Sequence, residues 1–242
     1  MNSLKSSLLC CLVVVPAISH AETIKLLIQE FAPFTHTDIK TGEIQGALTE
    51  KVQEILKRAG DNYNIGSTSL ARGLQSTLND DNTCLFGFRR TPERENSFKW
   101  VGPLVTDNWV LYGRKTDSRL LKNFEDAKPY SIGSYKNAAT GLQLHEQGYK
   151  IEFSNQDEDN PRLLVNGRLD YWIVSESHGM VIAQQQGFGH EIARAIKWKS
   201  IELNMLCNVR MDKQRMELYN KINKELDNDG TMEKIMRKYG IK

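Results

Sequence analysis

Apolar positions in the first half of the chain alternate between two patterns. Short runs rich in Ile, Leu and Phe have the composition of buried strands, while other segments gather their apolar residues on one helical face. Gly60 follows the longest helical segment, where a glycine commonly ends a helix. This order favours α/β architecture with a mainly parallel sheet. The predicted elements are strands at Thr23–Gln29 and Thr83–Phe88 and helices at Ala47–Ala59 and Arg72–Leu78.

A second α/β series follows an extended segment at Val101–Arg114 that is rich in β-formers. No repeat, low-complexity tract or flexible linker separates the two series, so we expect two α/β lobes with a cleft between them. The predicted elements are strands at Tyr130–Ile132, Ile151–Phe153 and Leu169–Val174, a turn over Gly133–Ala139 into a helix, a helix that starts at Asn160-Pro161, and closing helices over Asp212–Leu226 and after Gly230.

The segment Met1–Ala21 has the features of a secretory signal. A lysine precedes a short apolar run over Leu8–Val15, and the small residues Ser19 and Ala21 precede the expected cleavage point. An uncleaved membrane anchor is the alternative, but the run is far shorter than the roughly 20 residues that cross a bilayer. We therefore expect a soluble periplasmic chain that begins near Glu22 and does not insert into the membrane after cleavage.

Charge narrows the range of partners. The chain carries 32 Lys and Arg and 30 Asp and Glu residues, a formal net charge of +2. Because basic and acidic residues are almost equal in number, the net charge gives no electrostatic reason to bind nucleic acid or anionic membranes. The length that remains after cleavage suits one large domain or two lobes of about 100 residues each.

Two of the four cysteines lie in the predicted signal. The other two, Cys84 and Cys207, would enter a compartment that oxidises thiols, so a disulfide is favoured, with two separate buried thiols as the alternative. Neither has a CxxC partner or a spaced histidine, and we expect no metal site.

Catalytic signatures are missing from the sequence. His145-Glu146 and His190-Glu191 each begin like a zinc-peptidase motif, but neither has the second histidine at the required spacing. There is no GxSxG elbow, SxxK pair or P-loop. The acidic run Gln156–Asp159 lacks the glycine and distal glutamate of a calcium loop, and we interpret it as a solvated loop before a helix cap. We expect no cofactor and no enzymatic activity.

Four segments, in order along the chain, carry a resemblance to a known family. Together they resemble the family 3 extracellular solute-binding proteins, which include the amino-acid receptors of ABC importers. The resemblance covers essentially the whole chain after the signal. The segments are EFAPFTHTDIKTGEIQGALTEKVQEILKRAG (Glu30–Gly60), FRRTPERENSFKWVGPL (Phe88–Leu104), NGRLDYWIV (Asn166–Val174) and LDNDGTMEKIMRKYG (Leu226–Gly240).

The resemblance implies a type II periplasmic binding protein-like fold, in which two α/β lobes are joined by two crossing strands. The first crossing is expected near Val105–Leu111 and the second near Ile196–Leu203. Cys84 and Cys207 would then share a lobe, where a disulfide leaves hinge motion free. The implied boundaries are a signal peptide at 1–21, lobe 1 at 22–106 and 199–242, and lobe 2 at 107–198.

The resemblance also implies a ligand site between the lobes. Arg94 matches an arginine that pairs with a ligand carboxylate, as a planar guanidinium can, and its alternative is a solvated arginine near a helix start. Phe31 matches an aromatic residue that packs on the ligand, and its alternative is a core or turn phenylalanine. Ser134 and Tyr135 open a turn of the second lobe whose N–H groups and hydroxyls contact the carboxylate.

Other positions depart from the family pattern. Where amino-acid receptors usually hold the ligand ammonium with an aspartate, this chain has Ser175 followed by Glu176, which strand alternation would send to opposite sides. Arg89 replaces a small hydroxyl residue, and because Arg89 and Arg90 alternate along a strand, only one is expected to face the cleft. A cationic cleft without the carboxylate favours an anionic or non-amino-acid ligand.

Three more side chains are candidates for the walls of the site. Arg72 lies in a segment that borders the cleft in the family that the sequence resembles, and its alternative is an ordinary exposed helix residue. Trp109 and Trp172 are candidates for apolar walls of the site. Trp109, near the hinge, is the stronger candidate, and the alternative for Trp172 is a position in the core.

The sequence therefore predicts a periplasmic protein that closes on a small polar or anionic solute, an amino acid or related compound, for ABC-type uptake or sensing. Its partners would be that solute and an inner-membrane ABC permease or a sensor kinase, and we expect a monomer. One alternative is a cyclohexadienyl dehydratase-like lyase on the same fold, with Glu176 or His178 as acid or base. Another is a sensory module of a lytic transglycosylase or kinase that acts in trans.

Overall fold

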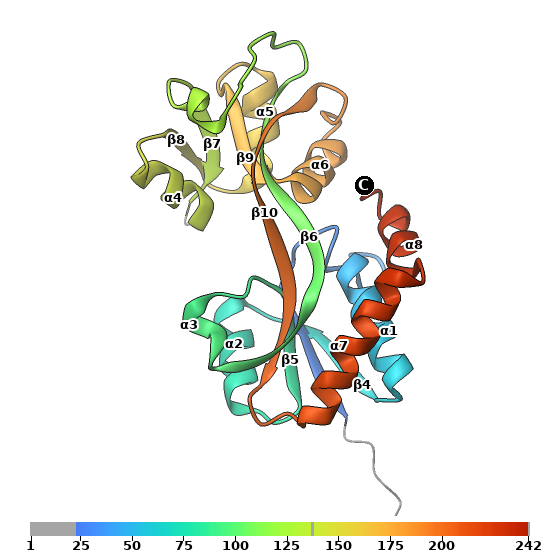
Figure 1. Cartoon of the computed structure of the whole chain (residues 1–242). Helices are drawn as coiled ribbons and strands as arrows, with labels where there is room; N and C mark the ends of the chain where they lie inside the picture. The colour runs from blue at the N-terminus through green and yellow to red at the C-terminus, as the bar shows by residue number, and fades with distance from the viewer. Residues whose placement is uncertain (1–22, 137, 242) are drawn as a thin grey trace, which may run out of the picture.

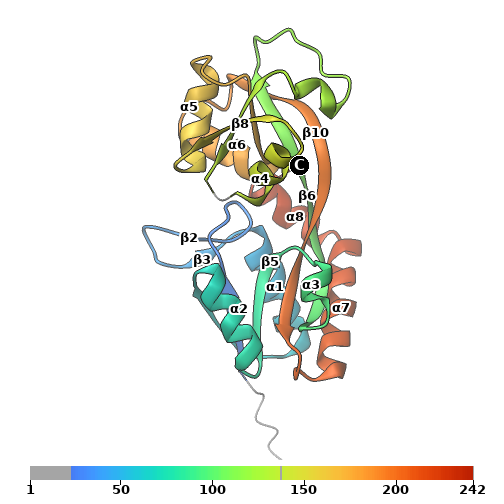
Figure 2. The same ribbon diagram turned by 90° about the vertical axis from the view of Figure 1, so that its left-hand side faces the viewer.

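Two long strands, β6 (Phe98–Arg114) and β10 (Ile192–Asn208), dominate the structure. They run antiparallel, with Val105 opposite Leu203 and Leu111 opposite Ile196. In the computed structural model, which describes residues 23–136 and 138–241, these strands join two α/β lobes (Figures 1 and 2). The expected crossings coincide with paired stretches of β6 and β10. The predicted signal peptide lies outside the described residues.

Lobe 1 is built from both ends of the described chain. β1 pairs in parallel with β4 and β5, and β5 pairs antiparallel with the returning β10. The elements are β1 (Ile24–Ile28), β2 (His36–Thr37), β3 (Ile44–Gln45), α1 (Ala47–Ala59), β4 (Tyr63–Ser67), α2 (Leu70–Asn79), β5 (Thr83–Phe88), α3 (Pro92–Glu95), α7 (Lys213–Asn228) and α8 (Thr231–Lys238). The expected end of α1 is confirmed, because Gly60 caps it with a left-handed φ of 78°.

Alternation along β1 supplies apolar side chains to both faces of the lobe 1 sheet. Ile24, Leu26 and Ile28 join the larger core, which α1, α7 and α8 cover. Leu27 points the other way into a smaller cluster, against which Leu74 of α2 packs. Because successive side chains of a strand point to opposite faces of the sheet, the helices on each face pack against a different set of β1 residues.

Cys84 of β5 and Cys207 of β10 lie opposite each other in the sheet and form a disulfide. Both are fully buried in the larger core of lobe 1. The bond joins positions 123 residues apart in the sequence and ties the early and late parts of this lobe together. The favoured pairing of the two cysteines is confirmed.

Lobe 2 lies between the two crossing strands in sequence. β7 pairs in parallel with β8 and β9, and β9 pairs antiparallel with β6. One core packs under α5 and α6, and a second under α4 and η1. The elements are η1 (Phe124–Ala127), β7 (Ser131–Tyr135), α4 (Ala139–Glu146), β8 (Lys150–Ser154), η2 (Asp157–Asp159), α5 (Asn160–Val165), β9 (Tyr171–Ser175) and α6 (Glu176–Gln185).

The expectation of a mainly parallel sheet is confirmed for β1, β4 and β5, the strands of the segment from which it was drawn, but the eight-stranded sheet as a whole is mixed. Its order is β4-β1-β5-β10-β6-β9-β7-β8. Pairing is parallel at both outer ends, but β10 and β6 run antiparallel between them because a chain that crosses to lobe 2 must return. Across residues 23–136 and 138–241, no helix combines the length and apolar character needed to cross a membrane.

One predicted boundary in lobe 2 is also wrong. The turn expected from Gly133 begins later, because β7 continues to Tyr135. Gly133 lies inside the strand, where an added Cβ would stand 2.4 Å from Leu169 Cδ1 and 2.7 Å from Asn160 Oδ1. The glycine is there for close packing rather than for a turn.

Candidate functional site

The two lobes touch where β1 and β9 end. Phe31 follows β1 in a turn that contains the cis Ala32-Pro33 peptide, and His178 lies in the first turn of α6. The ring centroids of Phe31 and His178 are 4.8 Å apart. His178 Nδ1 lies 2.6 Å from the carbonyl oxygen of Ala32. Since a carbonyl oxygen only accepts hydrogen bonds, Nδ1 is the protonated nitrogen in this contact.

These ends define the candidate site. Carboxyl ends of parallel strands lie at one edge of a sheet, so the segment after β5 accompanies that after β1, and the end of β7 accompanies that of β9. We call the following residues the interlobe region: 29–33 and 89–94 of lobe 1, 107–109 of β6, and 134–136 and 175–178 of lobe 2.

Arg94 lies in α3, directly after β5, and is partly buried. Its backbone N–H donates to the Thr91 carbonyl at 3.0 Å, which fixes the short helix. Within the described chain its guanidinium has neither a hydrogen-bond nor an ion-pair partner. A partly buried guanidinium without a partner is suited to bind an anion, a carboxylate above all.

The neighbouring arginines are placed differently. β5 ends at Phe88, so Arg89 and Arg90 lie in a loop and the strand alternation expected for them does not apply. Arg90 Nε donates to Glu95 Oε2 at 2.6 Å, and its guanidinium lies over the Trp100 ring. Arg89 is exposed. The pKa of Lys199 on β10 is lowered, first by burial and then by the charge of Arg89.

Arg72 lies on the exposed side of α2, outside the interlobe region. Its Nε donates to Ser69 Oγ at 3.1 Å, so it is held to the start of its own helix.

Trp109 stands at the junction of the lobes. Its ring packs against the larger core of lobe 1 and against a core of lobe 2. Its neighbours across the sheet are Ser175 on β9 and Lys199 on β10. Its indole Nε1 is buried, and no described residue accepts a hydrogen bond from it. Buried donors are normally satisfied, so this N–H is available to a ligand or a water molecule.

Asp107 lies two residues before Trp109, on the same face of β6. It is only 4% exposed. Its carboxylate accepts hydrogen bonds from the hydroxyls of Ser175 and Ser177. Burial raises the pKa of Asp107, and the hydrogen bonds from these serines oppose that rise.

The start of α6 corrects the expectation for Ser175 and Glu176. β9 ends at Ser175, which caps α6 by accepting from the His178 N–H at 3.4 Å. Glu176 is therefore a helical residue, and strand alternation does not relate the two. One Glu176 oxygen accepts from Asn108 Nδ2 and the other from Arg194 Nη1, each at 2.9 Å.

The predicted turn of lobe 2 offers one accessible side chain. Ser134 is 1% exposed and packs toward α4, where a Cβ on Gly141 would lie 2.4 Å from its Oγ. Tyr135 is 41% exposed at the end of β7. Burial raises the pKa of Tyr135, and the charges of Asp157 and Glu158 raise it further. The Tyr135 hydroxyl therefore stays protonated and can donate.

We expected the acidic run before α5 to be a solvated loop, but its residue Asp157 is buried. Asp157 is 8% exposed and accepts from Trp172 Nε1 at 2.8 Å and from Asn160 Nδ2 at 3.0 Å. Trp172 is fully buried, which places it in the core of lobe 2 rather than in the wall of a site. In the part of the chain that the structure describes, no three His, Cys, Asp or Glu side chains gather into a metal site.

Sequence reasoning missed Asp107 and Ser177. The available signal was a carboxylate two positions before Trp109, inside a strand otherwise rich in β-formers. Nothing local to that strand indicates the residues that face it, because Ser175 lies 68 positions further along the chain.

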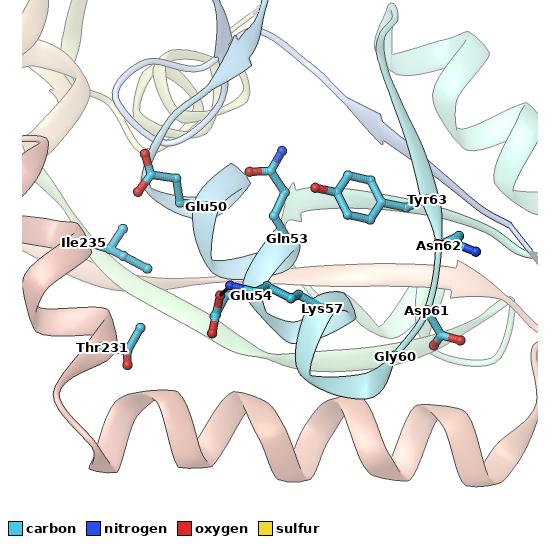
Figure 3. A pocket seen from close by; sticks show the side chains of 10 residues that line it. All are labelled: Glu50, Gln53, Glu54, Lys57, Gly60, Asp61, Asn62, Tyr63, Thr231 and Ile235. Atoms are coloured by element: carbon cyan, nitrogen blue, oxygen red, sulfur yellow. Dashed lines mark ion pairs between the residues drawn. The ribbon is translucent and has the colours of Figure 1, made fainter. Parts of the chain in front are cut away.

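A separate hollow of about 700 Å³ lies on lobe 1 beside α1 and α8 (Figure 3). Its acidic groups already have partners within the protein. Glu54 accepts from Arg58 Nε at 3.0 Å, and Asp61 accepts from the Tyr219 hydroxyl at 2.6 Å. No predicted ligand residue is among the side chains that line it, which are Glu50, Gln53, Glu54, Lys57, Gly60, Asp61, Asn62, Tyr63, Thr231 and Ile235.

Two α/β lobes, joined by crossing strands and meeting at the ends of their parallel strands, define a binding protein of the periplasmic type. The chain belongs to the bacterial extracellular solute-binding proteins, family 3, whose model matches residues 25–242. The arginine-binding extracellular protein ArtP of Bacillus subtilis (strain 168) is 24% identical to it over 225 residues, which are 89% of this chain and 86% of ArtP. The resemblance found in the sequence is thus confirmed.

Solved structures share the fold. A putative binding component of an ABC transporter from Wolinella succinogenes DSM 1740, complexed with lysine, has a TM-score of 0.73 at 15% identity, over 90% of this chain and 95% of that one. A histidine kinase sensor domain with similarity to periplasmic binding proteins has a TM-score of 0.71 at 18% identity, again over 90% and 95%.

Proposed function

We propose that this protein binds a small polar solute, an amino acid or a related compound, between its lobes in the periplasm. The observation that carries the proposal is Arg94, a partly buried guanidinium in the interlobe region with no hydrogen-bond or ion-pair partner among the described residues. Such a group is matched by a carboxylate, which it binds through two parallel hydrogen bonds. Membership of family 3 and the arginine-binding relative support a ligand of this class.

We infer that the lobes close on the solute because it has greater affinity for the closed state. Phe31 and Trp109 would form walls, while Tyr135 and Ser175 would contribute from lobe 2. Lobe boundaries near 106/107 and 198/199 are supported by the packing, since the core of lobe 1 ends at Val105 and resumes at Ile201. The protein would act as a monomer that delivers its solute to an ABC permease or presents it to a sensor kinase.

A thermal-shift screen of amino acids, organic acids and small amines tests the proposal. A solute present at 100 times its Kd is expected to add about 2.7 kcal/mol to the free energy of unfolding. Arg94→Ala should lose this shift because the carboxylate loses its bidentate partner. Arg237→Ala is the control, since the ion pair of Arg237 with Glu233 lies on the exposed surface of α8. If no compound raises the Tm, or if Arg94→Ala responds like the parent, the site is wrong.

We also propose that the protein performs no chemistry on its solute. Both oxygens of Glu176 are engaged by Asn108 and Arg194, and His178 Nδ1 is engaged by the Ala32 carbonyl. Glu176 is thereby held as an acceptor within the protein, while His178 keeps Nε2 as the nitrogen that the lyase alternative would need as a base. Incubation with prephenate or arogenate should leave both unchanged, and turnover of either would establish the lyase alternative.

A further inference from the structure

The stretch of chain that joins the two lobes is short. β6 pairs with β9 of lobe 2 from Trp109 onward, and β10 pairs with β5 of lobe 1 from Asn204 onward. Between these points the crossing strands pair with each other alone among the described residues, over 105–108 of β6 and 200–203 of β10. A rotation of one lobe against the other is therefore taken up in this stretch (Figure 1).

Packing in lobe 1 fixes one end of the stretch. Val105 of β6 and Ile201 and Leu203 of β10 are buried in the larger core of that lobe. Thr106 and Glu202 lie opposite each other and are exposed. The part that moves with lobe 1 therefore extends to Val105 on one strand and to Ile201 on the other.

Side-chain hydrogen bonds tie the other end to the start of α6 in lobe 2. Asn108 Nδ2 donates to Glu176 Oε2 at 2.9 Å, and Ser200 Oγ donates to Asn108 Oδ1 at 3.1 Å. The second Glu176 oxygen accepts from Arg194 Nη1 of β10 at 2.9 Å. We call these four residues, Asn108, Glu176, Arg194 and Ser200, the hinge clamp. It joins both crossing strands to one helix of lobe 2.

Asp107 holds the same turn of α6 and lies next to Asn108 on β6. Its buried carboxylate accepts from the hydroxyls of Ser175 and Ser177 and from the backbone N–H groups of Asn108 and Ser177. A buried carboxylate needs several such donors, and here the protein supplies them. From Asp107 onward, β6 is thus bound to lobe 2.

We propose that the hinge clamp confines the pivot between the lobes to Thr106 on β6 and to the peptide between Ser200 and Ile201 on β10. Asn108 is its positioning residue, because its amide bonds to the helix on one side and to the second strand on the other. The inference rests on the proposed binding function and goes beyond it, since it concerns how closure is set. Glu176, which we expected to contact the solute, acts in the hinge instead.

A confined pivot has a consequence for binding. If the crossing strands flexed along their whole length, the first turn of α6 would shift against β6 each time the lobes moved. With the clamp in place, this turn moves with lobe 2 as one body, and the unliganded protein samples a narrow range of lobe angles. The solute then selects the closed state from fewer alternatives, which raises its apparent affinity.

An exchange of hydrogen-bonding groups tests Asn108 with little change in shape. Asn108→Asp replaces the amide donor with a carboxylate that faces Glu176, so like charges repel and the clamp is broken. Adding Glu176→Gln restores the bond in the reverse direction, because the new amide N–H donates to the new carboxylate while its oxygen still accepts from Arg194. Asn64→Asp is the control, since Asn64 is exposed on β4 and lies away from the hinge.

Pulsed electron paramagnetic resonance on the unliganded protein gives the distribution of distances between the lobes. Spin labels are attached through Lys224→Cys on α7 and Glu146→Cys on α4, both exposed sites, and the native cysteines are protected by their disulfide. Asn108→Asp should broaden the distribution. Its affinity for the amino acid that gives the largest thermal shift should fall about 3- to 10-fold. The double variant should recover the parental width and affinity, and Asn64→Asp should match the parent.

The proposal is overturned if Asn108→Asp keeps the parental distribution, or if the double variant remains as broad as the single one. A clamp that only stabilises the fold would lower the Tm of Asn108→Asp and leave the distance distribution of the folded molecules unchanged, which also overturns it. The distances are measured without solute. Failure of every compound to bind would therefore overturn the proposed binding function and leave this test intact.

Discussion

Lys51 of α1 is fully buried, and its charge has an acidic partner in the protein. Its ammonium donates to the Leu104 carbonyl at 2.7 Å and to Asp227 Oδ1 at 2.6 Å. Burial lowers the pKa of Lys51, and the hydrogen bond that Lys51 donates to Asp227 counters this. The pair joins α1 to α7 and to the part of β6 where the crossing begins.

Removing this partner should be costly. Asp227→Asn is expected to lower the free energy of unfolding by about 2–3 kcal/mol, because it leaves a buried ammonium without its counter-charge. The loss should stay below that of a fully buried pair, since Asp227 is 47% exposed. Urea denaturation at pH 7 measures it. Glu233→Gln breaks an exposed pair on α8 and should cost less than 1 kcal/mol. Equal losses would show that Lys51 does not depend on Asp227.

At this scale the sequence identified candidates by position but not their partners. Arg94, Phe31 and Trp109 could be named because each lies in a recognisable segment. Asp107 could not, because its importance comes from burial and from the register that places Ser175 opposite Trp109. The pairing of Arg90 with Glu95 likewise depended on where β5 ends, which strand composition does not settle.

Among the elements, α6 bears directly on the site, since its first turn carries Ser177 and His178. The helix lies unusually close to the sheet at Gly179. An added Cβ there would stand 2.4 Å from Val174 Cγ1 and 3.0 Å from Tyr112 Cε2. The absence of a side chain at this position allows α6 to rest on β9 and β6, and thereby fixes where its first turn projects.

Gly179→Ala should therefore disturb both stability and binding. We expect a loss of about 1–3 kcal/mol from overpacking, together with weaker solute binding because the start of α6 is displaced from β9. Gly66→Ala is the matched control, since no atom lies within 4 Å of the Cβ it would add on β4. Thermal unfolding and calorimetry measure the two effects. A Gly179→Ala variant with parental affinity would show that the first turn of α6 is positioned independently of this contact.

Prediction from sequence placed most of the helices and strands and missed those without a clear local signal. Ala47–Ala59 and Thr83–Phe88 were predicted with the bounds that α1 and β5 have. α6 was missed because its buried residues are only Gly179, Ile182 and Ala183, too few to produce a strong apolar face. β2 and β3 have two residues each and leave no periodic signal. The antiparallel pairing of β6 and β10 was missed because partner choice is not a local property.

For the whole molecule, the disulfide and the hinge have separate roles. The disulfide between Cys84 and Cys207 lies within lobe 1, so it does not restrain the stretches of β6 and β10 that cross between the lobes. Between the lobes, the contact of His178 with Ala32 and Phe31 bears on closure most directly. A protonated imidazole also donates from Nδ1, so this contact persists in either charge state of the ring.

His178→Ala should shift the molecule toward open conformations. The variant loses one hydrogen bond and one ring contact, each worth about 1 kcal/mol, so solute affinity should fall about 5- to 30-fold. Small-angle scattering should show a larger radius of gyration for the unliganded variant than for the parent, and a saturating solute should remove the difference. His190→Ala is the control, because His190 is exposed in the same lobe and lies outside the interlobe region. If the radius and the Kd of His178→Ala both match those of the parent, the lobes are held together by other contacts and His178 contributes nothing to closure.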